Sequence, residues 1–179
     1  MPLLAETLVD EWLNRQGFFT MRGIKDGVDE IDLLGVRQTP SGLEGWHVEA
    51  QVSFRPVGYI TKLTRERARI LDKDRTSAWE RPPDILHESV AAWVAHKFTS
   101  DEKAATRQRA WPGVQWRFHF VHGVVREQAE LDEIGRCGVT VLPLHRVLTA
   151  VCTRVDGGLT GAAGTDLADI VDYYESHRQ

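Results

Sequence analysis

The chain has 179 residues, of which 42% are hydrophobic and 27% are charged, a composition typical of a globular protein with a buried core. No apolar run approaches the roughly 20 residues that span a bilayer, and the acidic start MPLLAETLVDEW lacks the pattern of a signal peptide. The length predicts one domain over residues 1–179. Cys137 and Cys152 are too few for a disulfide framework, so we expect a cytoplasmic protein.

The charge is unevenly distributed along the chain. A formal net charge of -4 does not by itself indicate a nucleic-acid-binding protein. Between residues 55 and 81, however, basic side chains outnumber acidic ones; they are Arg55, Lys62, Arg65, Arg67, Arg69, Lys73, Arg75 and Arg81. This stretch predicts either a basic patch or only the solvated face of a helix, and the sequence favours neither.

The first part of the chain predicts a helix followed by three strands. Leu4, Leu8 and Trp12 recur at a spacing of four, and Gly17 follows as a cap, so residues 3–16 predict a helix. Residues 18–22 and 28–36 have the apolar and β-branched content of strands. We expect a turn over 38–45 and a third strand over 46–54, which pairs with the second as an antiparallel hairpin.

Helices and strands alternate in the remainder. Residues 59–71 predict a helix that carries most of the basic side chains, and a helical insertion follows over 81–112. That insertion predicts a helix over 85–98 and a second one starting at Thr99, which has capping-box spacing to Glu102. Beyond it we expect a strand over 114–125, a short helix over 127–137, a strand buried on both faces over 139–144, a loop over 156–165 and a helix capped by Thr165. This order predicts an α/β fold with a mixed central sheet flanked by helices.

Two predicted strands bring carboxylates together. Alternate side chains of a strand share a face, so Glu49 and Gln51 point away from the apolar face of the third strand. His47 shares their face, and the pattern favours an edge-strand side chain over one that supports the site from behind Glu49. Asp32 lies on the corresponding face of the second strand, so pairing of the two strands makes Asp32 and Glu49 neighbours. For any one of these residues, a solvated side chain is the default interpretation.

Neighbouring carboxylates repel each other unless a cation lies between them. Mg²⁺ prefers oxygen ligands and usually takes one or two carboxylates together with water and substrate phosphates. The sequence therefore predicts a Mg²⁺ or Mn²⁺ site of the kind that phosphodiester hydrolysis uses.

The order of these pieces resembles the PD-(D/E)XK nuclease superfamily, in particular its restriction-endonuclease-like and Holliday-junction-resolvase-like branches. The pieces are Glu6 on the first helix, the run Gly17-Phe18-Phe19, the segment VDEIDLLG over 28–35 and the segment HVEAQV over 47–52. The resemblance covers residues 1–65, and the later strands fit the same fold loosely. It implies a restriction-endonuclease-like αβββαβ core.

The resemblance implies roles for five residues. The candidate catalytic residues are Glu6, Asp32, Glu49 and Gln51. Asp32 and Glu49 would bind the metal ion with the backbone carbonyl of Ala50, and Glu6 matches a helix-borne glutamate that orders a water or a second ion. Gln51 would orient the attacking water.

Gln51 departs from the family pattern, which usually has lysine there. Losing a preorganised positive charge can cost on the order of 3 kcal/mol of transition-state stabilisation. Lys62 and Arg55 are the cations expected to reach back and replace it.

Two functions from different classes follow. The first is a metal-dependent nuclease that acts on DNA, with RNA as the alternative, and whose basic helix contacts the phosphate backbone through Lys62, Arg65, Arg69 and Lys73. The second is a catalytically inactive nuclease-fold module that binds nucleic acid or serves in assembly. The missing lysine and the negative net charge favour this second function. The insertion over 81–112 predicts a substrate clamp or a homodimer contact.

Overall fold

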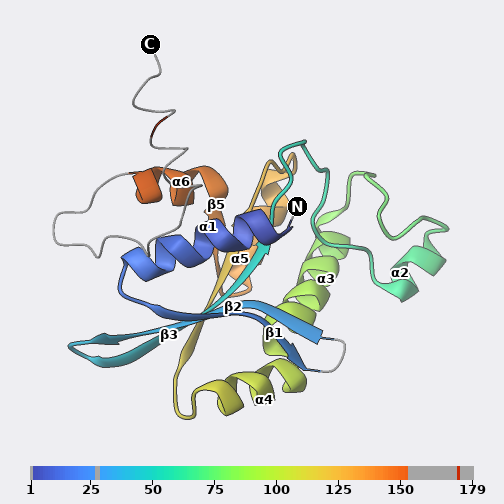
Figure 1. Ribbon diagram of the computed structural model, residues 1–179. Helices are drawn as coiled ribbons and strands as arrows, with labels where there is room; N and C mark the ends of the chain where they lie inside the picture. The colour runs from blue at the N-terminus through green and yellow to red at the C-terminus, as the bar shows by residue number, and fades with distance from the viewer. Residues whose placement is uncertain (1, 27–28, 153–172, 174–179) are drawn as a thin grey trace.

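A mixed sheet forms the centre of the protein (Figure 1). The computed structural model describes residues 2–26, 29–152 and 173. In these ranges five strands lie side by side in chain order: β1 (Phe19–Asp26), β2 (Asp29–Thr39), β3 (Gly42–Gln51), β4 (Trp116–His122) and β5 (Val139–Pro143). The pairs β1–β2 and β2–β3 are antiparallel, whereas β3–β4 and β4–β5 are parallel. The expected α/β fold with a mixed sheet is confirmed.

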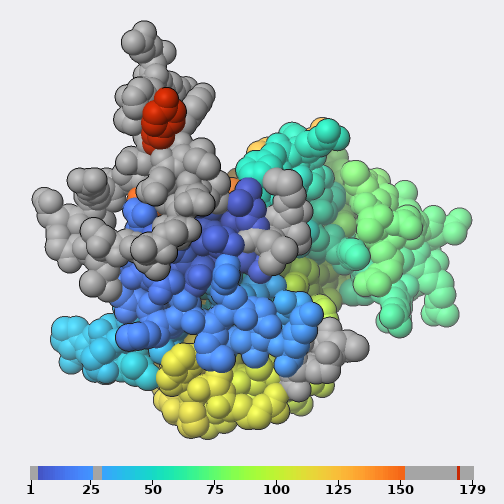
Figure 2. All heavy atoms as spheres, in the orientation of Figure 1, coloured from blue at the N-terminus to red at the C-terminus, as the bar shows by residue number. Residues whose placement is uncertain are grey.

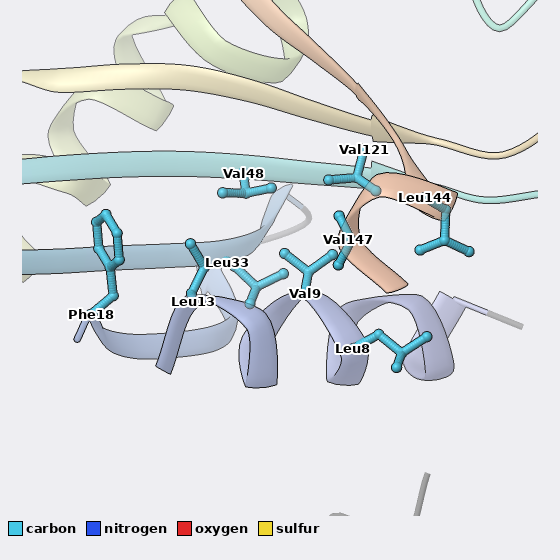
Figure 3. Close-up of a cluster of buried hydrophobic side chains, with 9 residues drawn as sticks. All are labelled: Leu8, Val9, Leu13, Phe18, Leu33, Val48, Val121, Leu144 and Val147. Atoms are coloured by element: carbon cyan, nitrogen blue, oxygen red, sulfur yellow. The ribbon is translucent and has the colours of Figure 1, made fainter. Parts of the chain in front are cut away.

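Helices cover both faces of this sheet. On one face α1 (Pro2–Arg15) lies beside α6 (Leu144–Cys152), as Figure 1 shows. Their apolar side chains pack against β2, β3 and β4 in one core cluster, drawn in Figure 3, which consists of Leu8, Val9, Leu13, Phe18, Leu33, Val48, Val121, Leu144 and Val147. The i, i+4 spacing of Val9 and Leu13 places both on the buried stripe of α1.

The opposite face carries α3 (Pro83–Val94) and α5 (Gln128–Arg136), which contact each other. The second core cluster lies there and includes Val90, Phe98, Phe120 and Ile134. Since Phe120 and Val121 are consecutive in β4, their side chains enter opposite cores, and this strand is buried from both sides.

The hairpin between β2 and β3 is tighter than expected. The strands continue to Thr39 and from Gly42, so the turn shrinks from the predicted 38–45 to Pro40 and Ser41. Gly42 has φ 120°, a backbone conformation that residues other than glycine rarely adopt. The tight turn sets the β2–β3 register.

The prediction of a helix over 59–71 is wrong for most of these residues. Only α2 (Arg65–Ile70) is helical, and Thr64 caps it by accepting a hydrogen bond from the N–H of Arg67 at 3.2 Å. The preceding segment is held differently, because the backbone N–H groups of Ile60 and Thr61 donate to the buried carboxylate of Glu130 at 2.7 and 2.8 Å. That tertiary contact prevents the helix from starting earlier.

The segment predicted as an insertion is helical, with two corrections. After α3 the chain forms a π-helical turn, η1 (Ala95–Thr99), before α4 (Asp101–Ala110). Ser100, not Thr99, caps α4, because its hydroxyl accepts a hydrogen bond from the N–H of Lys103. Turns of this kind often mark functional positions in helices.

The C-terminal predictions are only partly met. β5 is an edge strand whose Thr140 is exposed, so it is not buried on both faces, and α6 was not predicted. The loop over 156–165 lies outside the described residues, and so does the helix capped by Thr165 apart from Tyr173, which is helical. No helix in the described ranges combines the length and the apolar character needed to cross a bilayer. The single domain and the cytoplasmic location stay predictions.

Gly123, which follows β4, permits a close approach of the chain after β3. A Cβ atom there would lie 2.2 Å from the carbonyl oxygen of Ser53 and 2.5 Å from its nitrogen. We expect Gly123→Ala to lower the free energy of unfolding by about 1–3 kcal/mol, because the backbone must shift. Gly135→Ala is the matched control: nothing lies within 4 Å of its added Cβ in α5, and it should stabilise by about 0.5–1 kcal/mol. Urea titrations measure both, and equal effects would contradict this account.

Candidate active site

Asp32 and Glu49 meet where β2 and β3 separate. The final ladder pair toward this end is Leu33 with Val48, so Asp32 and Glu49 are the next residues on the two strands and share a face. Asp32 Oδ2 accepts a hydrogen bond from the backbone N–H of Ala50 at 2.8 Å. This contact holds the carboxylate of one strand against the backbone of the other.

These side chains open into a hollow of about 200 Å³, here called the Glu49 pocket. It lies between the start of α1, the end of β3 and the junction of α3 with η1. Its lining residues are Glu6, Asp32, Glu49, Ala50, Gln51, Trp93, Lys97 and Phe120. All five residues for which the sequence predicted a role in the site, Glu6 and Ala50 included, therefore contribute to one cavity.

Lys97 is the residue that sequence reasoning missed. It lies in η1, and its Nζ donates a hydrogen bond to Glu49 Oε2 at 2.6 Å. Lys62 and Arg55, the cations expected near the site, are exposed and do not line the pocket. The one available signal was the spacing of four between Trp93 and Lys97, which places both on one helix face. Nothing in that spacing indicates that the face meets β3.

His47 is buried rather than at an edge, because β3 lies between β2 and β4. Its ring is 0% exposed, with Nε2 3.0 Å from Glu49 Oε1 and Nδ1 3.0 Å from an Nη1 of Arg107. Burial, and then the cations Arg107, Lys103 and Lys97, hold the pKa of His47 well below its usual value, so the ring is neutral.

The pocket holds more negative than positive charge. Burial and then repulsion by Glu49 raise the pKa of Asp32 from 3.8 to about 6. Burial also raises the pKa of Glu49, against the lowering effect of Lys97, and the pKa of Glu6 is raised by burial and by Asp32. Burial lowers the pKa of Lys97, but Glu49 and Asp32 outweigh it and the pKa is raised. One ammonium therefore compensates several carboxylates.

The donor set fits a hard divalent cation. Two carboxylates and the Ala50 backbone offer only oxygen ligands, and Mg²⁺ commonly takes one or two carboxylates and keeps its remaining places for water and phosphate. In the described part of the chain, no group of three or more His, Cys, Asp or Glu side chains is arranged to hold a metal ion. Oxygen ligands as such suit Mg²⁺ or Mn²⁺ better than zinc, which favours nitrogen and sulfur.

The predicted nucleic-acid-binding residues do not reach the pocket. Lys62, Arg65 and Arg69 are exposed, and the segment around α2 projects on the far side of α3 from the sheet (Figures 1 and 2). Lys73 lies over the ring of Trp79, with Nζ 4.9 Å from its centroid. These side chains form a surface separate from the pocket lining.

No family model matches the sequence, and no curated protein matches it. Among solved structures, the chain is similar to the crystal structure of the protein of unknown function AF1548, with 13% sequence identity and a TM-score of 0.41. The match covers 78% of this chain and 58% of that chain, so this chain spans less than two thirds of its length. A likeness this distant supports no argument about function.

The raised pKa of Asp32 predicts how stability depends on pH. Because the folded protein keeps the Asp32 proton up to about pH 6 and the unfolded chain releases it near pH 3.8, stability falls as the pH rises through this window. Asp32→Asn removes the charge and keeps an acceptor for Ala50. We expect this variant to be more stable than the parent by up to about 3 kcal/mol above pH 6, and equally stable below pH 4.

Thermal unfolding of both proteins at pH 4 and pH 8, without divalent ions, measures this difference. The gain at pH 8 should be several degrees, since 1 kcal/mol shifts the midpoint by about 2–4 °C at this size. A variant that is no more stable than the parent at pH 8 would show that Asp32 carries no unfavourable charge.

Proposed function

We propose that this chain is a divalent-metal-dependent nuclease with a restriction-endonuclease-like αβββαβ core, which hydrolyses phosphodiester bonds of DNA. The observation that carries the proposal is the convergence of Asp32, Glu49 and Lys97 in one pocket, with Glu6 and Gln51 at its wall. These residues come from α1, β2, β3 and η1, so their meeting does not follow from one amphipathic pattern.

Asp32, Glu49 and the carbonyl of Ala50 would hold Mg²⁺ or Mn²⁺. Such an ion, when bound, neutralises phosphate charge and makes a water molecule more acidic. The chain's own carboxylates favour its binding, because burial and then repulsion from Glu49 raise the pKa of Asp32, and a cation would offset both. Glu6 adds a further acceptor at the same cavity and would orient water.

Lys97 supplies the positive charge that Gln51 cannot. In the family that the sequence resembles, lysine stands at the strand position of Gln51, whereas here an ammonium enters the same cavity from a helical segment 46 residues later in the chain. Lys97 would contact the oxygens of the scissile phosphate once it leaves Glu49. Gln51, which is exposed at the pocket, would hydrogen-bond to the water.

One observation favours the second function, an inactive nuclease-fold module. Both Glu49 oxygens already have partners, because His47 meets Oε1 and Lys97 meets Oε2. A buried ion pair of this kind can be purely structural. In that case the pocket needs no metal, and the chain would act through its surfaces on nucleic acid or a partner subunit.

The first test uses supercoiled plasmid with Mn²⁺ or Mg²⁺. We expect the parent to nick it, and Asp32→Ala and Glu49→Ala each to lose at least about 100-fold in rate, because each removes a metal ligand. Glu44→Ala is a control, since that carboxylate belongs to β3 but pairs with Arg37 and Arg117 outside the pocket. Absence of nicking together with absence of a Mn²⁺-induced thermal shift would favour the inactive module.

Substitution of Lys97 should affect metal binding and turnover in opposite directions. Lys97→Met removes the ammonium that competes with a cation for Glu49, so we expect tighter Mn²⁺ binding by isothermal titration calorimetry. The same variant should hydrolyse DNA about 100-fold more slowly, since the positive charge near the phosphate is lost. Lys103→Met, which removes a neighbouring buried ammonium, controls for a general change of field. Weaker Mn²⁺ binding in Lys97→Met would contradict the assignment.

The basic surface around α2 is proposed to contact the DNA backbone. Replacing Arg65 and Arg69 by glutamate should weaken binding to duplex DNA about tenfold or more at low salt and reduce the salt dependence, because fewer counterions are released. Fluorescence anisotropy over a range of salt concentrations measures this. Unchanged binding would exclude α2 from the interface, whatever the outcome for the pocket.

A further inference from the structure

We infer that Arg107 is a positioning residue for the Glu49 pocket: one of its amino groups fixes the ring tautomer of His47, which orients Glu49, and also fastens the helical turn that carries Lys97. What this positioning serves rests on the proposed function, but the positioning itself does not. Arg107 lies in α4, outside the pocket lining, and its side chain is 7% exposed.

The tautomer of His47 follows from counting donors. An arginine has only N–H donors, so the nitrogen that Arg107 meets, Nδ1 of His47 at 3.0 Å, must be the acceptor and carries no proton. The single ring proton is then on Nε2, which lies 3.0 Å from Glu49 Oε1. His47 can therefore only donate to Glu49, as ionised carboxylate oxygens require.

The same amino group of Arg107 also reaches η1. Nη1 carries two hydrogens and has two acceptors, Nδ1 of His47 and the backbone carbonyl of Phe98 at 2.6 Å. Phe98 directly follows Lys97, whose Nζ donates to the other Glu49 oxygen at 2.6 Å. Arg107 thus bonds directly to His47 in β3 and to the backbone of the η1 turn that carries Lys97.

Packing restricts this arrangement to one geometry. The Arg107 guanidinium carbon lies 5.1 Å from the centroid of the Phe118 ring, and His47 lies against both Phe98 and Phe118, with ring centroids 5.0 and 5.9 Å apart. Phe98 is fully buried. With aromatic side chains on several sides, neither the ring of His47 nor the guanidinium can rotate freely, so the hydrogen bonds select the orientation of Glu49.

The decisive measurement is the protonation of the His47 ring nitrogens, observed by ¹⁵N NMR in the full chain without metal or nucleic acid. We expect a bare Nδ1 and a protonated Nε2 at neutral pH in the parent. In Arg107→Met the donor at Nδ1 is lost while Glu49 still accepts from Nε2, so we expect Nδ1 to gain a proton and the ring to be doubly protonated in a fraction of the molecules. Arg107→Lys keeps one charged donor and should retain the parent tautomer at least in part. Arg109→Met, on the same helix but exposed, is the matched control and should leave the ring unchanged.

A second readout concerns the metal. Groups that orient a ligand commonly change metal affinity 10- to 100-fold when removed. We expect Arg107→Met and His47→Leu to weaken Mn²⁺ binding about 10-fold, whereas His47→Gln, which keeps an N–H donor toward Glu49, should recover most of the affinity. A purely structural role would lower thermal stability in all three variants without this recovery.

The inference fails if the parent carries its proton on Nδ1, or if Arg107→Met keeps both the parent tautomer and the parent Mn²⁺ affinity. Should Arg107→Met not fold, the inference is still tested by the tautomer of the parent and by that of Arg107→Lys. The Mn²⁺ affinities of His47→Leu and His47→Gln test it independently. If the tautomer is as inferred but the parent does not bind Mn²⁺, then the proposed function is wrong and the positioning role of Arg107 remains.

Discussion

The structure depends on one electrostatic constraint, the crowding of carboxylates where β2 and β3 separate. Asp32 and Glu49 share a face there because the register of the hairpin requires it, and neither can turn away, since Asp32 is held by the Ala50 backbone and Glu49 is buried. Repulsion of this kind is relieved either by a proton, which the raised pKa of Asp32 reflects, or by a nearby cation. Lys97 is such a cation within the chain.

Helices on both faces of the sheet place residues in the Glu49 pocket. The packing of α1 on β2 and β3 through Val9, Leu13 and Leu33 brings the first turns of α1, with Glu6, to the open end of the hairpin. On the other face, α3 and η1 pack against Phe120 and deliver Lys97 to the same cavity. Arg107 then links η1 to β3. A segment predicted as an insertion is in this way integral to the site.

Local patterns predicted the parts of the fold in which burial follows sequence periodicity. The first helix, the three strands after it and the α/β order were recovered, because each has a continuous apolar face. The prediction of a long helix over 59–71 was wrong, because the backbone N–H groups of Ile60 and Thr61 donate hydrogen bonds to Glu130, about 70 residues away in the chain. No propensity argument contains such a contact.

The sequence by itself determined that Asp32, Glu49 and Gln51 share one face of a hairpin, because a strand alternates its side chains and the register follows from the apolar set. It also placed Glu6 on the preceding helix. Only the tertiary structure decided which cation reaches this face and how Glu49 is oriented. Lys97 and Arg107 lie about 50 and 60 residues beyond β3, and their approach depends on how α3, η1 and α4 pack on the sheet. Packing of separate elements depends on shape and volume throughout the core, which no spacing along the chain encodes.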